Sequence, residues 1–320
     1  MSASTRAPQS PPPPRPTARL TIGVIGAGRV GTALGAALHQ AGHLIAAITP
    51  SSQPDRASGN LPGTPTRPAA EVALAATDLL LLAVPDDALA AVVGQLPNPP
   101  VGQVVAHTSG AHGLAVLHPV TVRGAHPVAL HPAMTFTGAW QGEHRDLDRL
   151  PGIGYGVTAP EPLRPFATRL VADLGGVPEW VAEAARPLYH AGLAHGANHL
   201  VTLVNEAADQ LRSAGVAQPQ RLLGPLLRAA LDNVLQVGDA ALTGPVARGD
   251  AGTISRHLAA LRESAPASLT AYRELARRTA DRALAAGQLP VEAAEPLLTA
   301  LAATPAPPAE AATGPREGRR

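Results

Sequence analysis

The pattern of hydrophobic and polar residues divides the chain into two parts. Up to residue 181, short apolar runs alternate with longer segments of helical periodicity, and turn residues separate them. The predicted strands are residues 20–25, 43–49, 78–84, 101–107, 124–130, 153–157 and 178–181, with helices at 32–41, 88–96 and 161–174 among them. Strands that alternate with helices predict an α/β fold with a doubly wound, mostly parallel Rossmann sheet.

From residue 182 onward the pattern contains only helices. They are rich in alanine and leucine and are interrupted at 215–219, at 238–245, near Pro266 and at 287–290. We therefore expect an α/β domain at 19–182 and an all-helical second domain at 183–302. The proline-rich residues 1–18 and the tail 303–320 are expected to be disordered.

The first predicted strand leads into a turn that contains Gly26, Gly28 and Gly31, and a helix of small residues follows. Backbone N–H groups and the positive end of the helix dipole face the space above such a turn, which suits a pyrophosphate. Arg29 and Val30 lie inside the turn and belong to the expected cofactor site. A purely structural turn is the alternative, but its strand-to-helix context favours dinucleotide binding by the domain at 19–182.

The loop after the second predicted strand selects the cofactor in such folds. An acidic residue there binds the ribose 2′-hydroxyl of NAD, whereas this chain offers Ser51, Ser52 and Arg56. These residues favour the 2′-phosphate of NADP. Asp55 lies in the same loop and could instead bind the 2′-hydroxyl of NAD, so NAD remains an alternative cofactor. The other interpretation is that the loop is an ordinary solvated turn.

Composition excludes several classes of protein. A net charge of +1 with 2% aromatic residues provides no basic, aromatic surface for nucleic acid. The chain has no cysteine, so disulfides and thiolate metal sites are excluded, and its 25 basic residues are all arginine, which excludes a lysine Schiff base or general acid. No segment reads as a signal sequence or a membrane span, so we expect a cytoplasmic protein with no membrane partner.

Two residues that follow neighbouring strands are candidate catalytic groups. Ser109 follows the strand at 101–107, and His131 follows the strand at 124–130. Ligands of open α/β sheets occupy the crevice beyond the carboxyl ends of the strands, so we expect both side chains beside the nicotinamide. Hydride transfer to a carbonyl or imine requires a proton, and histidine titrates in the right range. Plain turns are the alternative for both residues.

The segment 189–205 carries polar side chains on a predicted helix. At helical spacing His190, Asn198 and Asn205 share one face, with small or apolar residues between them. Either this face lines a substrate cleft, or its polar groups are satisfied within the core. His195 and His199 have the spacing of a metal-binding pair, but the glutamate of a zinc motif is missing and we expect no metal.

A glycine- and proline-containing loop at 242–250 joins two predicted helices. Arg248 can hold a substrate carboxylate in bidentate fashion, and backbone N–H groups beside Thr243 can add to an anion site. The alternative is a simple turn in which Asp250 caps a helix and Arg248 forms a surface ion pair. We assign Thr243 and Arg248, together with His190 and Asn198, to the binding of a small-molecule substrate across the domain cleft.

Together these motifs resemble one known family. The turn 26–31, Val84 and Pro85 with the two aspartates after them, the motif 131–136, the segment 189–198 and the loop 241–250 are similar to Rossmann-like proteins with a DUF2520 domain. These proteins belong to the 6-phosphogluconate-dehydrogenase-like and pyrroline-5-carboxylate-reductase-like superfamily. The resemblance implies an NAD(P)-dependent oxidoreductase, a homodimer formed through the helical domain, and a cofactor site that includes Val84 and Pro85.

Two narrower resemblances bear on mechanism. Prephenate and arogenate dehydrogenases place a serine after one strand and a His-Pro after the next, as Ser109 and His131 stand here, which implies an acid–base histidine. Ketopantoate reductases and β-hydroxyacid dehydrogenases use a lysine that this chain lacks. The expected function is an oxidoreductase that prefers NADP to NAD and reduces a C=O or C=N in a small carboxylated metabolite. A non-catalytic NADP(H)-binding sensor or regulatory protein is the alternative.

Overall fold

The computed structural model describes residues 19–142 and 145–302. The segments 1–18 and 303–320, which we expected to be disordered, lie outside the described residues. The chain divides into two compact units, Met1–His199 and Leu200–Arg320. This division lies downstream of the boundary at 182/183 expected from the last strand, because Arg186 and Tyr189 of the next helix are hydrogen-bonded to the sheet.

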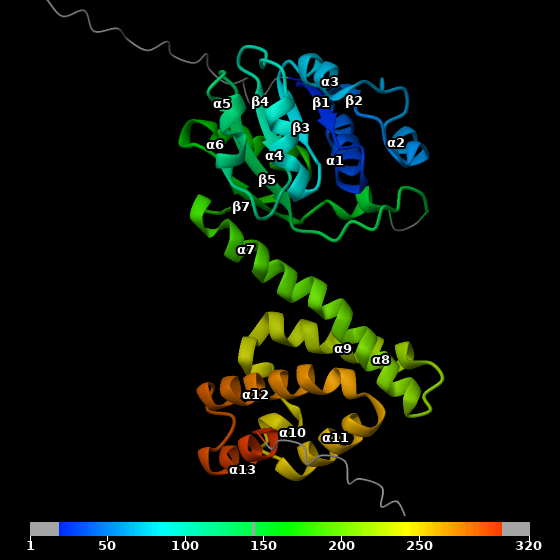
Figure 1. Ribbon diagram of the computed structural model, residues 1–320, viewed down its shortest axis with the longest axis vertical. Helices are drawn as coiled ribbons and strands as arrows, with labels where there is room; N and C mark the ends of the chain where they lie inside the picture. The colour runs from blue at the N-terminus through cyan, green and yellow to red at the C-terminus, as the bar shows by residue number, and fades with distance from the viewer. Residues whose placement is uncertain (1–18, 143–144, 303–320) are drawn as a thin grey trace, which may run out of the picture. The chain divides into compact units, whose positions relative to one another are not determined.

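The seven strands of the described residues form one sheet in the order β2-β1-β3-β4-β5-β6-β7 (Figure 1). They are β1 (Thr21–Ile25), β2 (Leu44–Ile48), β3 (Leu79–Leu82), β4 (Val104–His107), β5 (His126–Pro132), β6 (Gly154–Thr158) and β7 (Val177–Trp180). Neighbouring strands are parallel, apart from β5 and β6, which are antiparallel. The mostly parallel Rossmann sheet predicted from the sequence is confirmed.

The carboxyl ends of β1, β3 and β4 meet at one edge of the sheet. Ile25 pairs with Leu82, and Leu82 pairs with His107. Because His107 in turn pairs with Ala129, β5 continues past this edge and includes His131, which we had expected just after the strand. The strand order reverses between β1 and β3, and ligands of open α/β sheets bind beside such a switch point.

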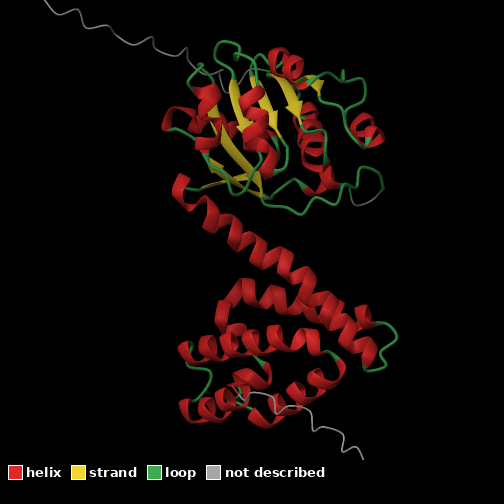
Figure 2. Cartoon of the chain, in the orientation of Figure 1, coloured by secondary structure: helices red, strands yellow, loops and turns green. Residues whose placement is uncertain are grey.

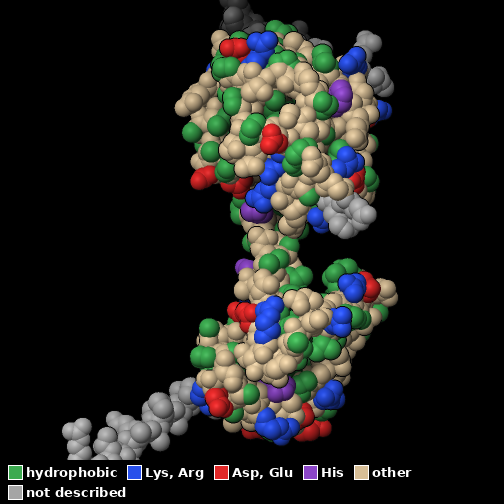
Figure 3. Space-filling view, turned by 90° about the vertical axis from the view of Figure 1, so that its right-hand side faces the viewer, with side chains coloured by type: hydrophobic (Ala, Val, Ile, Leu, Met, Phe, Trp, Pro, Cys, Tyr) green, Lys and Arg blue, Asp and Glu red, His purple; other side chains and the backbone are tan. Residues whose placement is uncertain are grey.

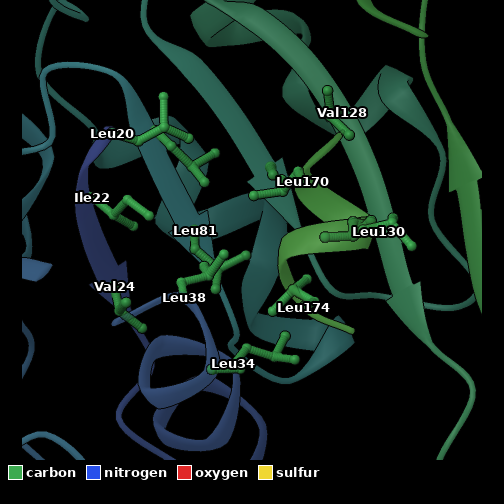
Figure 4. Packing of buried hydrophobic residues seen from close by; sticks show 14 of the residues in the cluster. Leu20, Ile22, Val24, Leu34, Leu38, Leu81, Val128, Leu130, Leu170 and Leu174 are labelled. Carbon is green, nitrogen blue, oxygen red and sulfur yellow. The ribbon is translucent and has the colours of Figure 1, made fainter. Parts of the chain in front are cut away.

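Helices cover both faces of the sheet. The helices of this unit are α1 (Arg29–Gln40), α2 (Pro54–Asn60), α3 (Ala69–Ala75), α4 (Asp86–Gln95), α5 (His118–Thr121), α6 (Arg164–Asp173) and α7 (Arg186–Leu193). Consecutive residues of β3 alternate between two apolar clusters: Leu81 packs with α1 and α6 (Figure 4), whereas Leu80 packs with α3 and α4. The sequence did not predict α2, α3 and α5, because helices of four to seven residues are too short to show a period.

Helix α4 begins at Asp86, two residues before the start at residue 88 that the sequence predicted. Asp86 and Asp87 lie in its first turn and do not cap it; the N-cap is Pro85, and no side chain bonds the first amides. Carboxylates in a first turn still face the positive end of the helix dipole. The two aspartates therefore stabilise the helix by charge and not by a capping hydrogen bond.

The second unit consists of helices without a strand among residues 200–302 (Figure 2). The helices are α8 (His199–Ser213), α9 (Pro219–Val237), α10 (Gly244–Ala247), α11 (Ala251–Ser264), α12 (Leu269–Ala285) and α13 (Val291–Ala302). Ile254, Ala280 and Leu297 lie at the centre of their core. The breaks fall where glycine and proline predicted them, and the all-helical second part is confirmed.

The helical run from α7 to α8 is not one regular helix. Residues Ala194–Asn198 form a π turn between α7 and α8, which inserts extra backbone into the run. The common face of His190, Asn198 and Asn205 was predicted at ideal α-helical spacing, so that angular argument does not hold across the turn. None of the described helices combines the length and apolar character that a membrane crossing needs.

Candidate functional site

Each of the three glycines after β1 meets a different constraint. Gly26 has φ +103° and lies against the backbone of Ala83, so only a residue without a Cβ fits there. A Cβ at Gly31 would overlap the carbonyl oxygen of Gly26. By contrast, no described atom lies within 4 Å of the position that a Cβ at Gly28 would take. The first and third glycines permit close packing, whereas the second faces open space.

The open side of Gly28 is also the start of α1. Gly28 is the N-cap of this helix and has no side chain to bond its first amides. The N–H of Thr32 bonds to the carbonyl of Gly28, while the amides of residues 29–31 have no partner among the described residues. Free amides at the positive end of a helix form an anion site. This arrangement has the geometry that a pyrophosphate requires.

The loop after β2 is tied to the glycine turn. The backbone N–H of Gly26 donates to Oγ1 of Thr49 (2.9 Å), and the hydroxyl of Ser51 donates to the carbonyl of Ala27 (2.8 Å). The donor of Ser51 is therefore already used, which the sequence did not reveal, while Ser52 is exposed. At the other side of the turn the backbone nitrogen of Val84 stands 3.1 Å from the Cβ position of Gly26, and Pro85 follows it on the surface.

The two arginines of the expected cofactor site reach the same loop after β5. Nη1 of Arg29 donates to the carbonyl of Phe136, and Nε of Arg56 donates to the carbonyl of Gly138, each at 3.1 Å. Neither arginine forms a salt bridge with a described residue. Their positive charges are available to a ligand.

His131 stands in a cluster of rings at the end of β5. Its Nδ1 lies 2.9 Å from the hydroxyl of Tyr189, and its ring packs edge-on against His190 with 5.8 Å between centroids. Gly110 makes room for both histidines: a Cβ there would come within 2.6 Å of Cδ2 of His190 and 3.1 Å of Nε2 of His131. The structure thus brings together two predicted site residues, His131 and His190, and adds Tyr189 to them.

Arg186, at the start of α7, is completely buried and joins α7 to the sheet. Its guanidinium donates to Oγ1 of Thr158 (2.9 Å) and to the carbonyls of Ser109 (3.1 Å), Ala129 (3.1 Å) and Gly156 (2.9 Å). No described carboxylate forms a salt bridge with it. Sequence reasoning missed this residue, because an arginine beside a proline at a helix start carries no sign that it is buried.

The environment of His131 favours its neutral form. Burial, together with the electrostatic influence of His190 and Arg186, lowers the pKa of His131 to about 4. Burial likewise lowers the pKa of His107 to about 4. Burial raises the pKa of Tyr189. We had expected His131 to titrate near neutrality; at pH 7 its imidazole is instead neutral, with one N–H donor and one acceptor nitrogen.

Ser109 serves the turn that holds Gly110 in place. It is 3% exposed; its Oγ accepts a hydrogen bond from the N–H of His112 (3.0 Å), and its own N–H donates to Nδ1 of His107 (3.2 Å). These bonds fit the turn that we weighed as the alternative to a catalytic serine. A catalytic role for Ser109 stays a prediction.

The remaining substrate candidates are not joined to this cluster by any described contact. Asn198 is exposed in the π turn. Thr243 lies in the helical unit, at the rim of a pocket of about 390 Å³ that also contains His257 and Tyr272. Arg248 is exposed and forms no salt bridge with a described residue, while Asp250 accepts the N–H of Thr253 (2.9 Å) and caps α11.

Comparison with known families agrees with this architecture. A Rossmann-like domain matches residues 8–132, and the domain of unknown function DUF2520 matches residues 153–279. The chain therefore carries a Rossmann-like domain followed by a DUF2520 domain. The resemblance to Rossmann-like proteins with a DUF2520 domain is confirmed. Among curated proteins, none matches the chain.

Three solved structures have a similar fold. A candidate NADP oxidoreductase of Bacteroides fragilis is 22% identical, with a TM-score of 0.67 over 82% of this chain and 98% of that one. A reductive aminase of Aspergillus terreus, solved with NADPH and ethyl-5-oxohexanoate, is 17% identical, with a TM-score of 0.63 over 88% and 99% of the two chains. An imine reductase of a Pseudomonas species is 21% identical, with a TM-score of 0.62 over 89% and 100%. At these identities the likeness establishes the fold.

Proposed function

We propose that the chain is an oxidoreductase that transfers hydride between NADP(H) and a C=O or C=N of a small carboxylated metabolite. The observation that carries the proposal is the glycine turn at the switch point of the sheet. Two of its glycines are fixed by packing, whereas Gly28 and the amides after it face open space. A turn with a purely structural purpose has no need of an open second glycine.

The residues around this turn fit NADP. The amides of Gly28, Arg29 and Val30 would hold the pyrophosphate, with Gly26 and Gly31 shaping the turn and Val84 and Pro85 beside it. Arg56 and Ser52 would face the 2′-phosphate, and Ser51 would shape the site through the bond of its hydroxyl to the carbonyl of Ala27. The reductive aminase of the same fold was solved with NADPH. We infer a preference for NADP over NAD.

The ring cluster provides the groups that handle the proton. Bound NADPH would supply the hydride to the substrate carbon. We infer that the Tyr189 hydroxyl donates to Nδ1 of His131, so that Nε2–H of His131 faces the space beside Gly110 and donates to the substrate oxygen or nitrogen. The proton of Nε2 would pass to the product while Nδ1 receives the proton of Tyr189. Ser109 would act as a positioning residue through its turn.

The charge of the cluster suits an anionic substrate. Arg186 is a buried cation for which the described residues provide no carboxylate partner. Its field favours a negative group nearby, whether a substrate carboxylate or charge that develops during reduction. We propose that His190, Asn198, Thr243 and Arg248 orient the substrate, as the sequence predicted.

The helical unit presents apolar side chains that have no described partner. On α8 and α9 these are Leu200, Val201, Leu203, Leu222, Leu226, Leu231, Val234, Leu235 and Val237, each more than two-fifths exposed. Basic and acidic side chains are interspersed on the face shown in Figure 3, which gives no single-sign surface there. We propose that a second copy of the chain covers the apolar residues of α9, forming a homodimer through the helical unit.

Hydride transfer is tested directly with the purified full-length chain and NADPH. Candidate 2-oxo acids and cyclic imines are screened by the loss of NADPH absorbance, and we expect turnover that His131→Ala reduces at unchanged NADPH affinity. Binding of NADPH without turnover of any substrate would support the sensor instead. Absence of nicotinamide nucleotide binding at millimolar concentration would contradict both functions.

A further inference from the structure

One loop supports both arginines of the expected 2′-phosphate site. It follows β5 and presents two carbonyls in succession, of Phe136 to Arg29 and of Gly138 to Arg56. The arginines come from different elements, the glycine turn at the start of α1 and helix α2. This third segment, distant in sequence, contacts both of them.

Both arginine side chains stand directly against Gly138. A Cβ at this residue would lie 2.9 Å from Nη2 of Arg56 and 3.0 and 3.1 Å from Cγ and Cδ of Arg29. Each guanidinium uses one N–H for a loop carbonyl and keeps other donors free. Neither guanidinium forms a salt bridge with a described carboxylate. Two neighbouring cations repel each other, and a phosphate dianion between them relieves that repulsion.

The loop itself is held in place by a buried carboxylate. Asp146 is 2% exposed; it accepts the N–H of Thr137 (3.1 Å), the hydroxyl of Thr137 (3.0 Å) and the N–H of Gly138 (2.7 Å). The ring of Trp140 lies on α2 so closely that a Cβ at Gly59 would overlap it. The carbonyls that receive the arginines are thus fixed in position.

We propose that this loop determines cofactor specificity: Gly138 and Asp146 hold Arg29 and Arg56 together as a pair that grips the 2′-phosphate of NADP. The inference rests on the proposed function, because it assumes that the cofactor occupies the glycine turn. Gly138 and Asp146 are positioning residues and do not touch the cofactor. The sequence alone assigned the choice of cofactor to the loop after β2, whereas Gly138 and Asp146 lie in the loop after β5.

Two glycines of the same loop provide a matched test. Gly138 and Gly142 have nearly the same backbone conformation, with φ +85° and +81°, but no described atom lies within 4 Å of a Cβ at Gly142. Alanine therefore introduces the same backbone strain at both residues and displaces the arginines only at Gly138. Circular dichroism of both variants checks that they are folded.

Calorimetric titration of the full-length variants with two ligand pairs gives the readout. The pairs are NADPH with NADH, and adenosine 2′,5′-bisphosphate with 5′-AMP; the members of each pair differ in the 2′-phosphate. We expect Gly138→Ala to raise the Kd of the 2′-phosphorylated member roughly ten- to a hundredfold and to change the other by less than about twofold. Gly142→Ala is expected to change none of them, and Asp146→Asn to act in the direction of Gly138→Ala.

Three results would overturn the inference. The first is that the unmodified chain binds NADPH and NADH with equal affinity. The second is that Gly138→Ala lowers the affinity for both nucleotides equally. The third is that Gly142→Ala loses as much NADPH affinity as Gly138→Ala. If the unmodified chain binds no nucleotide, the proposed function falls as well. If the 2′-phosphate preference is found without hydride transfer to any substrate, the inference stands and only the oxidoreductase activity is refuted.

Discussion

Two substitutions in the glycine turn should separate an effect on cofactor binding from an effect on protein stability. Gly28→Ala places a methyl group where no described atom lies within 4 Å, at a residue with φ −83° and ψ −161°, which alanine adopts without strain. Gly31→Ala places the same group against the carbonyl of Gly26 and 3.1 Å from Cβ of Ala83. The two substitutions are chemically identical and lie three residues apart.

The magnitudes follow from these surroundings. Overpacking a tight site costs about 1–3 kcal/mol, so Gly31→Ala should lower the free energy of unfolding by that amount, less the roughly 1 kcal/mol that alanine gains over glycine in a helix. At Gly28 the loss of a preferred N-cap and the reduced entropy of the unfolded chain nearly cancel, within about 0.5 kcal/mol. A methyl group between the amides and a pyrophosphate, however, should cost about 1–3 kcal/mol of binding, or roughly five- to 150-fold in Kd.

The chain carries a natural probe for the stability measurement. Its two tryptophans, Trp140 and Trp180, both lie in the first unit, so urea unfolding followed by tryptophan fluorescence reports on that unit alone. NADPH affinity is measured by calorimetry on the same samples. Gly94→Ala, on α4 and with no described atom near its Cβ position, is the control and should leave NADPH affinity unchanged. Unaltered NADPH affinity in Gly28→Ala would refute the assignment of this turn to the pyrophosphate.

Three further predictions concern other parts of the molecule. The pKa of His107 and of His131 is about 4 in the folded state, against an ordinary value of 6.5, so the unfolded chain binds more protons between pH 4 and pH 6.5. The free energy of unfolding should therefore be highest above pH 6.5 and fall by about 3 kcal/mol per histidine as the pH is lowered toward 4. Urea titrations that show no such fall would contradict this prediction. Arg186→Met leaves three carbonyls and a hydroxyl without their buried donor and should cost roughly 3 kcal/mol or more; a variant as stable as the original refutes this. Leu226→Glu on α9 should convert a dimer to monomers in sedimentation equilibrium, whereas Val122→Glu in the first unit, at 65% exposure against 64%, should not; a dimer that survives Leu226→Glu rules out this face.

The parts of the fold that the sequence predicted are those encoded within single elements. Strands such as β3 are continuous apolar runs because both their faces are buried, and the glycine turn has a fixed spacing because packing leaves no room for a side chain at Gly26 and Gly31. The short helices α2 and α3 lack a readable period. The π turn after α7 depends on how the helical run is packed, and no residue at 194–198 marks it in the sequence.

At the candidate site the sequence located His131 and His190 but not the groups that set their chemistry. Arg186 and Tyr189 act through contacts with residues between 28 and 77 positions away, and Asp146 acts through a loop that holds arginines from two other elements. Such contacts leave no local pattern. Both arginine and aspartate are ordinarily exposed residue types, so nothing in the sequence indicates that these two are buried.

The buried arginine changes how the histidine is to be understood. A histidine beyond a strand end suggests an acid that is half-protonated near pH 7, but burial, with the added charge of Arg186, lowers the pKa of His131 to about 4 and keeps it neutral there. If the Tyr189 hydroxyl donates to Nδ1, as we propose, the neutral imidazole presents its Nε2–H to a ligand, and this donor does not vary with pH above about 5. Under the proposed function this donor would polarise a C=O or C=N by a fixed hydrogen bond, and Tyr189 would supply the proton. We therefore expect the rate of reduction to be insensitive to pH across the range in which free histidine titrates.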